Sequence, residues 1–333
     1  MYALRQRADG DLALGSVYPH AANASFSVYS ARHDIHYLVD ENAGSVGAYR
    51  HRGGRWEMLA TIPTQGAAPC HIALNPAETL LAVANYASGS VSLFRLDMHD
   101  GLPRERARVH ANHGSGPDAQ RQDRPHAHWV GFSADGRWLY QADLGTDEIL
   151  AFAIDGAGDL RAAQRSYQAP PGSGPRHLLL HPHLTGKVYL ASELASTLTV
   201  LDHADGKFHN PLIMSTLPAD WQGDTIVAHV AINQAGTRLY VSNRGHDSIA
   251  VFAIGDDAIP TLLQHARAGG AFPRFFLLLE DQALMLVANE KGQTVSTLVI
   301  DGDGCLSPTG TELSIPGVCY LLIPASAKGE NRD

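Results

Sequence analysis

The sequence contains only three cysteines, Cys70, Cys305 and Cys319. Their number is odd and they lie far apart in the chain. They therefore predict neither the disulfide framework of a small secreted domain nor a zinc site, whose cysteines come in close pairs. We expect three free thiols.

Long apolar runs are also missing. No segment approaches the ~20 residues that a membrane-spanning helix needs, and the first residues, Met1–Arg7, do not begin a secretion signal, because no basic stretch with a following apolar region is present. These absences predict a soluble, cytoplasmic protein that does not bind membranes.

Positive charge is scarce, with 25 Lys and Arg against 34 Asp and Glu, which gives a formal net charge of -9. A negative surface repels phosphate backbones, so we expect no nucleic-acid partner. The chain is 44% hydrophobic and 18% charged, a balance that excludes disorder. Any anionic ligand must be bound by a local group of cations.

Several motifs of common catalytic sites do not occur. The chain has no Gly-x-Ser-x-Gly elbow for a Ser-His-Asp triad, no Gly-x-Gly-x-x-Gly turn and no phosphate-binding Gly-x-x-x-x-Gly-Lys-Ser/Thr loop. The sequence therefore predicts neither serine-hydrolase catalysis nor a nucleotide, and we expect no cofactor.

The sequence does contain a repeat. An apolar run, a turn, a second apolar run that ends in Asp, Asn or Ser, and an alternating third run recur six times. The clearest copies run from His71 to Phe94 and from His229 to Phe252. The second run ends at Asp40, Asn85, Asp143, Ser192, Asn243 and Asn289, at intervals of 45, 58, 49, 51 and 46 residues.

Runs of about five residues with alternating polarity are typical of strands, and repeats of 40–50 residues with four strands are typical of propeller blades. We predict an all-β fold, a seven-bladed β-propeller of four-stranded antiparallel blades, with residues 1–333 as a single domain. The segments Met1–Leu14 and Gly317–Ile323 are predicted as strands, so that both termini close the last blade. The polar, basic segment Met98–Pro125 in the longest interval is predicted to be a loop and a candidate lid.

Histidines recur at one position of the repeat. Counting back 14 or 15 residues from the end of each second run gives Phe26, His71, His128, His177, His229 and Phe275. In a propeller the first strand of each blade lines the central channel, so we predict that these side chains form a ring at its mouth. The alternative is that the histidines only bind backbone groups between blades.

Arginines and carboxylates recur beside this position. Arg176 and Arg274 directly precede it, and the residue after the second run is Glu41, Tyr86, Glu193, Arg244 or Glu290. Buried guanidinium and carboxylate groups are costly unless they pair or bind a ligand. We therefore predict that Arg176, Glu193 and Arg244 contact an anionic ligand.

The His126-Ala127-His128 pair raises the question of a metal site. Acidic ligands are absent nearby, and Arg176 and Arg244 in the same predicted pocket would repel a cation. We therefore predict no metal ligands.

Several motifs resemble the seven-bladed β-propeller lactonases, which include bacterial cytosolic 6-phosphogluconolactonase and fungal carboxymuconate cyclases. The resemblance runs from about Val28 to Ile323. It rests on Gly172-Ser173-Gly174-Pro175-Arg176-His177, Ser192-Glu193-Leu194, Ser242-Asn243-Arg244-Gly245-His246-Asp247, Pro125-His126-Ala127-His128 and Asp143-Leu144-Gly145-Thr146-Asp147. The Tyr-x-Gly-Thr-Tyr strand with which the family usually opens is missing here.

The resemblance implies a catalytic set of His128, Arg176, Glu193 and Arg244, the same four residues that the repeat brings together. His71, His126, His177, His229 and Arg274 are further candidates for substrate contacts. The implied reaction is metal-free hydrolysis of a sugar-acid lactone, either 6-phosphogluconolactone or an aldono- or aldarolactone. His128 or Glu193 would be the general base, and the arginines would bind the acidic group or the oxyanion.

Two alternatives remain. A muconate-type lactonising cycloisomerase makes essentially the reverse bond change with the same residue types. A non-enzymatic interaction propeller, such as a WD-repeat scaffold, would instead carry Gly-His and Trp-Asp markers in each blade, which this chain lacks.

Overall fold

Strands make up nearly all of the regular structure. The computed structural model describes residues 1–6 and 12–325, which contain 26 strands and a single 3₁₀ turn, η1 (Glu280–Gln282). The prediction of an all-β chain without long helices is confirmed. No helix among these residues is long and apolar enough to cross a membrane.

The described residues fall into two compact units. The first contains residues 1, 17–175 and 322–325, and the second contains residues 2–6, 12–16 and 176–321. The single domain over residues 1–333 stays a prediction.

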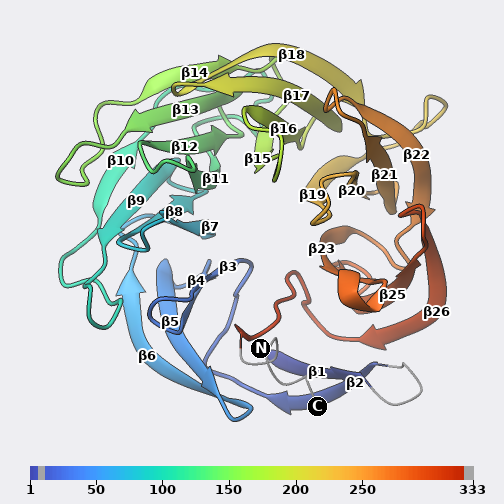
Figure 1. The fold of residues 1–333 in the computed structure, drawn as a ribbon, viewed down its shortest axis with the longest axis horizontal. Helices are drawn as coiled ribbons and strands as arrows, with labels where there is room; N and C mark the ends of the chain where they lie inside the picture. The colour runs from blue at the N-terminus through green and yellow to red at the C-terminus, as the bar shows by residue number, and fades with distance from the viewer. Residues whose placement is uncertain (7–11, 326–333) are drawn as a thin grey trace. The chain divides into compact units, whose positions relative to one another are not determined.

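The first unit holds three four-stranded sheets, in each of which the strands pair antiparallel in chain order (Figure 1). The first sheet is β3 (Ser27–Ser30), β4 (Ile35–Asp40), β5 (Ser45–Arg52) and β6 (Arg55–Pro63). The second is β7 (Pro69–Leu74), β8 (Leu80–Asn85), β9 (Ser90–Arg95) and β10 (Arg108–Ala111). The third is β11 (Ala127–Phe132), β12 (Trp138–Asp143), β13 (Glu148–Ala153) and β14 (Gln164–Gln168).

The second unit holds three more four-stranded sheets and one hairpin. The fourth sheet is β15 (Pro175–Leu180), β16 (Lys187–Ser192), β17 (Thr197–Ala204) and β18 (Lys207–Ser215). The fifth is β19 (Ile226–Ile232), β20 (Arg238–Arg244), β21 (Ser248–Ile254) and β22 (Pro260–Arg267). The sixth is β23 (Pro273–Leu279), β24 (Leu284–Asn289), β25 (Thr294–Ile300) and β26 (Leu306–Ser314), and the hairpin is β1 (Tyr2–Gln6) with β2 (Leu12–Val17).

The polar residues that end each second run lie where the repeat predicts them. Five are the last residue of a second strand, and Asn243 is the penultimate residue of β20. Four residues further on, every copy turns through a left-handed residue with φ between 51° and 64°: Gly44, Gly89, Asp147, Ser196, Asp247 and Gln293. This tight turn returns the chain antiparallel and leaves the residue after the second strand at the end of the sheet.

Apolar side chains on the strands fill the space between consecutive sheets. One core cluster joins Tyr37 and Val39 of the first sheet to Leu81 and Phe94 of the second. Another joins Tyr189 and Val200 of the fourth sheet to Val241 and Phe252 of the fifth. Because both faces of an inner strand are covered, β8 reads Leu-Leu-Ala-Val-Ala-Asn with all six residues buried.

Tyrosine hydroxyls tie each of these sheets to the next. Tyr37 donates to the carbonyl oxygen of Gly101 at 2.6 Å, and Tyr189 donates to Ala258 at 2.9 Å. Tyr240 donates to Gly304 at 2.9 Å. In every case the acceptor lies in the loop between the third and fourth strands of the following sheet. Burial raises the pKa of Tyr240 to about 12, so its hydroxyl stays a donor.

Two predicted segments differ from the structure. Residues 317–323 form no strand, because Pro316 has no N–H to donate and the chain turns at Gly317, with φ of 71°. Tyr320 packs on the Phe275 ring instead, with centroids 4.6 Å apart. Residues 98–125 are not one loop, since β10 lies within them.

The N-terminal segment is closer to its prediction. Strand β1 and the first part of β2 lie within Met1–Leu14, and the turn between them falls outside the described residues.

Replacing Tyr240 with Phe should lower the free energy of unfolding by about 1–3 kcal/mol, because the buried carbonyl of Gly304 loses its donor. Chemical denaturation measures this change. The exposed Tyr2→Phe is the matched control and should change stability by less than about 0.5 kcal/mol. Equal effects of the two substitutions would contradict a role for the inter-sheet bond.

Candidate functional site

The structure places the predicted site residues in two groups. Arg176 and His177 lie on β15, Glu193 follows β16, His229 lies on β19, Arg244 ends β20 and Arg274 lies on β23, all in the second unit. His71 on β7, His126 just before β11 and His128 on β11 belong to the first unit.

A buried charge cluster brings together three of the predicted residues. Oε2 of Glu193 accepts from Nε of Arg176 at 2.8 Å and pairs with a terminal nitrogen of Arg244, also at 2.8 Å. The exposed fractions of Arg176, Glu193 and Arg244 are 3%, 3% and 4%. One carboxylate therefore faces two guanidinium groups, and the three side chains together carry an excess positive charge away from water.

Arg244 keeps donor capacity for a ligand. Its terminal nitrogen also donates to the carbonyl of Val227 at 2.9 Å, whereas its buried Nε has no hydrogen-bond partner. Burial lowers the pKa of Arg244, the charge of Glu193 opposes this shift, and the charge of Arg274 adds to it. An arginine remains charged under these conditions, so the unpaired N–H favours an anionic acceptor.

Two histidines lie beside the arginines. A terminal nitrogen of Arg176 lies 2.9 Å from Nε2 of His177, and a cation donates, so this nitrogen of His177 is the acceptor. The rings of His177 and His229 are 6.0 Å apart, edge to face. Burial and the charge of Arg176 lower the pKa of His229 to about 3. His229 is therefore neutral at physiological pH.

Phe272, Arg274, Glu290 and Lys291 border this cluster. The Arg244 guanidinium lies 5.2 Å from the centroid of the Phe272 ring, and Nζ of Lys291 lies 3.8 Å from it. Arg274 pairs with Glu290 at 3.5 Å. Sequence reasoning missed Phe272 and Lys291. The available signal was that Phe272-Pro273-Arg274 matches Gly174-Pro175-Arg176, with an aromatic residue where the other copy has glycine.

In the first unit, His126 and His128 meet at Tyr86. The His126 ring stacks on Tyr86 with centroids 4.5 Å apart, and the His128 ring meets it edge to face at 5.4 Å. Nδ1 of His126 lies 3.1 Å from the Tyr86 carbonyl oxygen, and Nε2 lies 3.3 Å from Asp123. His126 is thus held by its neighbours.

A β-bulge shifts the predicted histidine position in the third sheet. His71 lies opposite Ala84 and Phe275 opposite Ala288, but the residue opposite Ala142 is Trp129. His128 is the extra residue of the bulge, so it corresponds to Cys70 and Arg274. The prediction that His128 shares the position of His71 is therefore wrong by one residue, because a bulge adds a residue that spacing does not reveal.

With this correction, the recurring position is a row of stacked rings in each unit. Phe26 lies 4.0 Å from His71, and His71 lies 5.7 Å from Trp129. In the second unit, the His229 and Phe275 rings are 4.2 Å apart. These contacts favour a packing role for His71. Its Nδ1 also lies 3.4 Å from the backbone N–H of Val130, as the structural alternative predicts.

Asp147 shapes the glycine-rich loop that leads into Arg176. Its Oδ2 accepts from the N–H of Gly172 at 2.7 Å, and its Oδ1 accepts from the N–H of Gly174 at 2.8 Å. The buried side chain of Gln122 donates to the same carboxylate at 2.8 Å. The segment around Gln122, part of the predicted lid, is thereby fastened to this loop.

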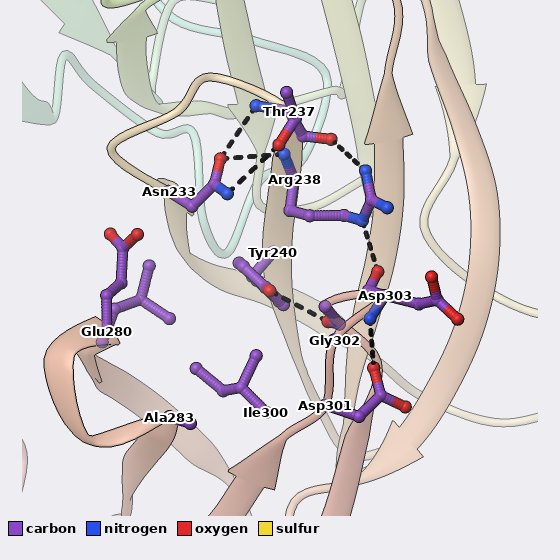
Figure 2. Close-up of a pocket in the computed structure, with 12 residues that line it drawn as sticks. Asn233, Thr237, Arg238, Tyr240, Glu280, Ala283, Ile300, Asp301, Gly302 and Asp303 are labelled. Atoms are coloured by element: carbon purple, nitrogen blue, oxygen red, sulfur yellow. Dashed lines mark hydrogen bonds between the residues drawn. The ribbon is translucent and has the colours of Figure 1, made fainter.

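A cavity of about 220 Å³ lies elsewhere in the second unit (Figure 2). Its lining includes Arg238, Tyr240, Glu280, Ile300 and Asp301 and none of the predicted site residues. Arg238 donates from Nε to the carbonyl of Asp303, and both oxygens of Glu280 accept from the N–H of Gln234. These bonds already occupy several of its polar groups.

A second cavity, of about 320 Å³, lies in the first unit between residues 113–117 and 146–148, next to Arg165. It also contains none of the predicted site residues. Within residues 1–6 and 12–325, no group of three or more His, Cys, Asp or Glu side chains is arranged to hold a metal ion.

The whole chain resembles known lactonases. Residues 2–323 match the family described as lactonase, seven-bladed β-propeller. A protein of Lactococcus lactis subsp. cremoris (strain MG1363) is 34% identical over 291 residues, which cover 85% of this chain and 83% of that protein. The 6-phosphogluconolactonase of Bacillus subtilis (strain 168) is 28% identical over 314 residues, 92% of this chain and 87% of that enzyme.

A crystal structure of a Lactobacillus plantarum protein superimposes with a TM-score of 0.85 at 28% identity and covers 96% of this chain and 93% of that one.

His229 should make the protein sensitive to acid. An unfolded histidine binds a proton near pH 6.5, whereas folded His229 does so only near pH 3. The unfolded state therefore binds more protons between these values, and the free energy of unfolding falls as the pH falls. His229→Phe, which copies the residue at this position in the first and sixth sheets, should reduce the loss between pH 6.5 and 5 by about 2 kcal/mol.

Denaturant unfolding at the two pH values measures this difference. The exposed His99→Gln should lose as much stability as the wild type. An unchanged loss in His229→Phe would show that His229 does not bind its proton in this way.

Proposed function

Because the chain belongs to the family of seven-bladed β-propeller lactonases, we propose that it is an enzyme that hydrolyses a sugar-acid lactone. Its substrate is 6-phosphogluconolactone or a related aldono- or aldarolactone. The Bacillus subtilis relative that is named 6-phosphogluconolactonase supports this class of substrate.

The observation that carries the proposal is the pair of buried arginines on one carboxylate. Arg176 and Arg244 share Glu193, which leaves an excess positive charge and an unpaired Nε–H of Arg244 in a buried position. Such a cluster is costly without a ligand. An anionic group, or an oxygen that becomes anionic during the reaction, would accept the unpaired N–H and balance the charge.

Lactone hydrolysis fits these groups. A water oxygen bonds to the ring carbonyl carbon, the carbonyl oxygen becomes an oxyanion, and the bond to the ring oxygen then breaks as that oxygen takes up a proton. Guanidinium donors of Arg176 and Arg244 would stabilise the oxyanion or bind the acidic group. No metal ion is needed for these steps.

The general base is assigned to His128 rather than to Glu193. Oε2 of Glu193 already accepts two guanidinium bonds, which favour its charged form. Glu193 then holds the arginines in place, and His128 removes the proton from water, as the family resemblance implies. His71, His126, His177, His229 and Arg274 remain proposed substrate contacts.

We also propose that residues 1–333 form one seven-bladed domain. The family description supports seven blades. The six four-stranded sheets would supply six of them, and the β1–β2 hairpin would supply strands of the seventh.

Purified protein should open 6-phosphogluconolactone or a glucaro- or galactarolactone faster than the spontaneous reaction, with equal rates in the presence and absence of a chelator. Arg244→Lys keeps the charge but loses the planar donor set, so kcat/KM should fall about 10²–10³-fold. His128→Gln should lose a similar factor through the missing base. Rates are followed by acid release at constant pH.

Arg238→Lys is the matched control, because Arg238 lines the separate cavity and lies outside the proposed site. It should keep wild-type kcat/KM. A folded wild-type protein without activity on any of these lactones would overturn the proposal. It would favour the muconate-type cycloisomerase, which a muconate substrate tests directly, or the interaction scaffold.

A further inference from the structure

Phe272 has a backbone conformation that is unfavourable for its side chain. It is left-handed, with φ of 66°. The corresponding residues of the first and second sheets, Asn23 and Ala68, are left-handed as well, with φ of 49° and 53°. In all three, the carbonyl accepts the N–H of the residue after the second strand. The repeat requires this conformation, and a bulky residue there costs about 1–2 kcal/mol.

The backbone of Phe272 is fixed on both sides. Oδ1 of Asp247 accepts its N–H at 2.8 Å, and the N–H of Glu290 donates to its carbonyl at 3.0 Å. These bonds hold the aromatic ring at one place beside the buried arginines. A strained residue that its surroundings hold in place is a reason to look for a function.

The ring lies close to two cations. Nζ of Lys291 is 3.8 Å and Cζ of Arg244 is 5.2 Å from the ring centroid, so the two atoms lie at most 9.0 Å apart, the total of both distances. Lys291 is exposed, whereas Arg244 is buried. The ring therefore links the buried cluster to a cation at the surface.

The carboxylates near this ring are already engaged. Glu193 binds Arg176 and Arg244, Glu290 pairs with Arg274, and Asp247 accepts backbone N–H groups. Among the described residues, no carboxylate pairs with Lys291. Lys291 and Nε of Arg244 thus remain for a ligand, one at the surface and one in the interior.

We propose that Phe272, Lys291 and Arg274 form a second anion subsite, which binds an acidic group at the far end of the substrate while Arg176 and Arg244 act at the lactone carbonyl. This inference rests on the proposed lactonase function. An extended six-carbon chain spans about 6 Å from end to end, which fits within the distance between Arg244 and Lys291. The subsite selects lactones with a terminal phosphate or carboxylate over neutral aldonolactones.

Lys291→Met tests the subsite, because it retains the length of the side chain and removes the charge. The ratio of kcat/KM for 6-phosphogluconolactone to that for glucono-1,5-lactone should fall about fivefold to tenfold, through KM for the charged substrate. Phe272→Leu retains bulk without the aromatic face and should lower the same ratio by a smaller factor. Lys207→Met, an exposed lysine on β18, is the matched control and should leave the ratio unchanged.

Binding gives a readout that does not need activity. By calorimetry, wild-type protein should bind 6-phosphogluconate more tightly than gluconate, and Lys291→Met should remove most of the difference. If catalysis needs Arg244 but neither ratio responds to Lys291→Met, the subsite is wrong and the lactonase function stands. If no lactone is opened but the binding preference depends on Lys291, the subsite stands and the reaction is wrong.

Discussion

Two guanidinium groups in the interior of the second unit need a counter-charge, and Glu193 supplies it for both. Removing one member of such a buried set leaves an uncompensated charge, which typically costs 3–5 kcal/mol. The positions of Arg176 on β15, Glu193 after β16 and Arg244 on β20 are therefore set by one electrostatic condition. The chain meets this condition because the three residues recur at related places in consecutive repeats.

The turns of the repeat serve the same cluster. Asp147 and Asp247 are equivalent left-handed residues, and each carboxylate accepts backbone N–H groups of the loop that precedes the next first strand. The loop bound by Asp147 leads into Arg176, and the residue bound by Asp247 is Phe272. A side chain that completes a turn in one sheet thus fixes the entry of the following sheet.

The sequence was sufficient to predict much of this architecture. The polar residue that ends each second strand is conspicuous in the repeat, and it gave the six sheets and the cluster of Arg176, Glu193 and Arg244. The β-bulge that makes Trp129 the counterpart of His71 was not predictable, because one additional residue hardly alters a spacing of 14 or 15. Residues 317–323 read as a strand because they are apolar, although Pro316 and Gly317 turn the chain. Phe272 was missed because polarity patterns carry no information about backbone dihedral angles.

The tyrosine bonds between sheets give each repeat two different sides. The fifth sheet offers the hydroxyl of Tyr240 to the sixth and accepts the hydroxyl of Tyr189 from the fourth at Ala258. One repeat therefore carries both a donor and its complementary acceptor, as in a head-to-tail assembly. A gene segment that encodes one such repeat can be duplicated in tandem, and the new copy would find a matching partner on either side. This directional complementarity provides a physical route by which proteins of this kind can gain or lose repeats during evolution.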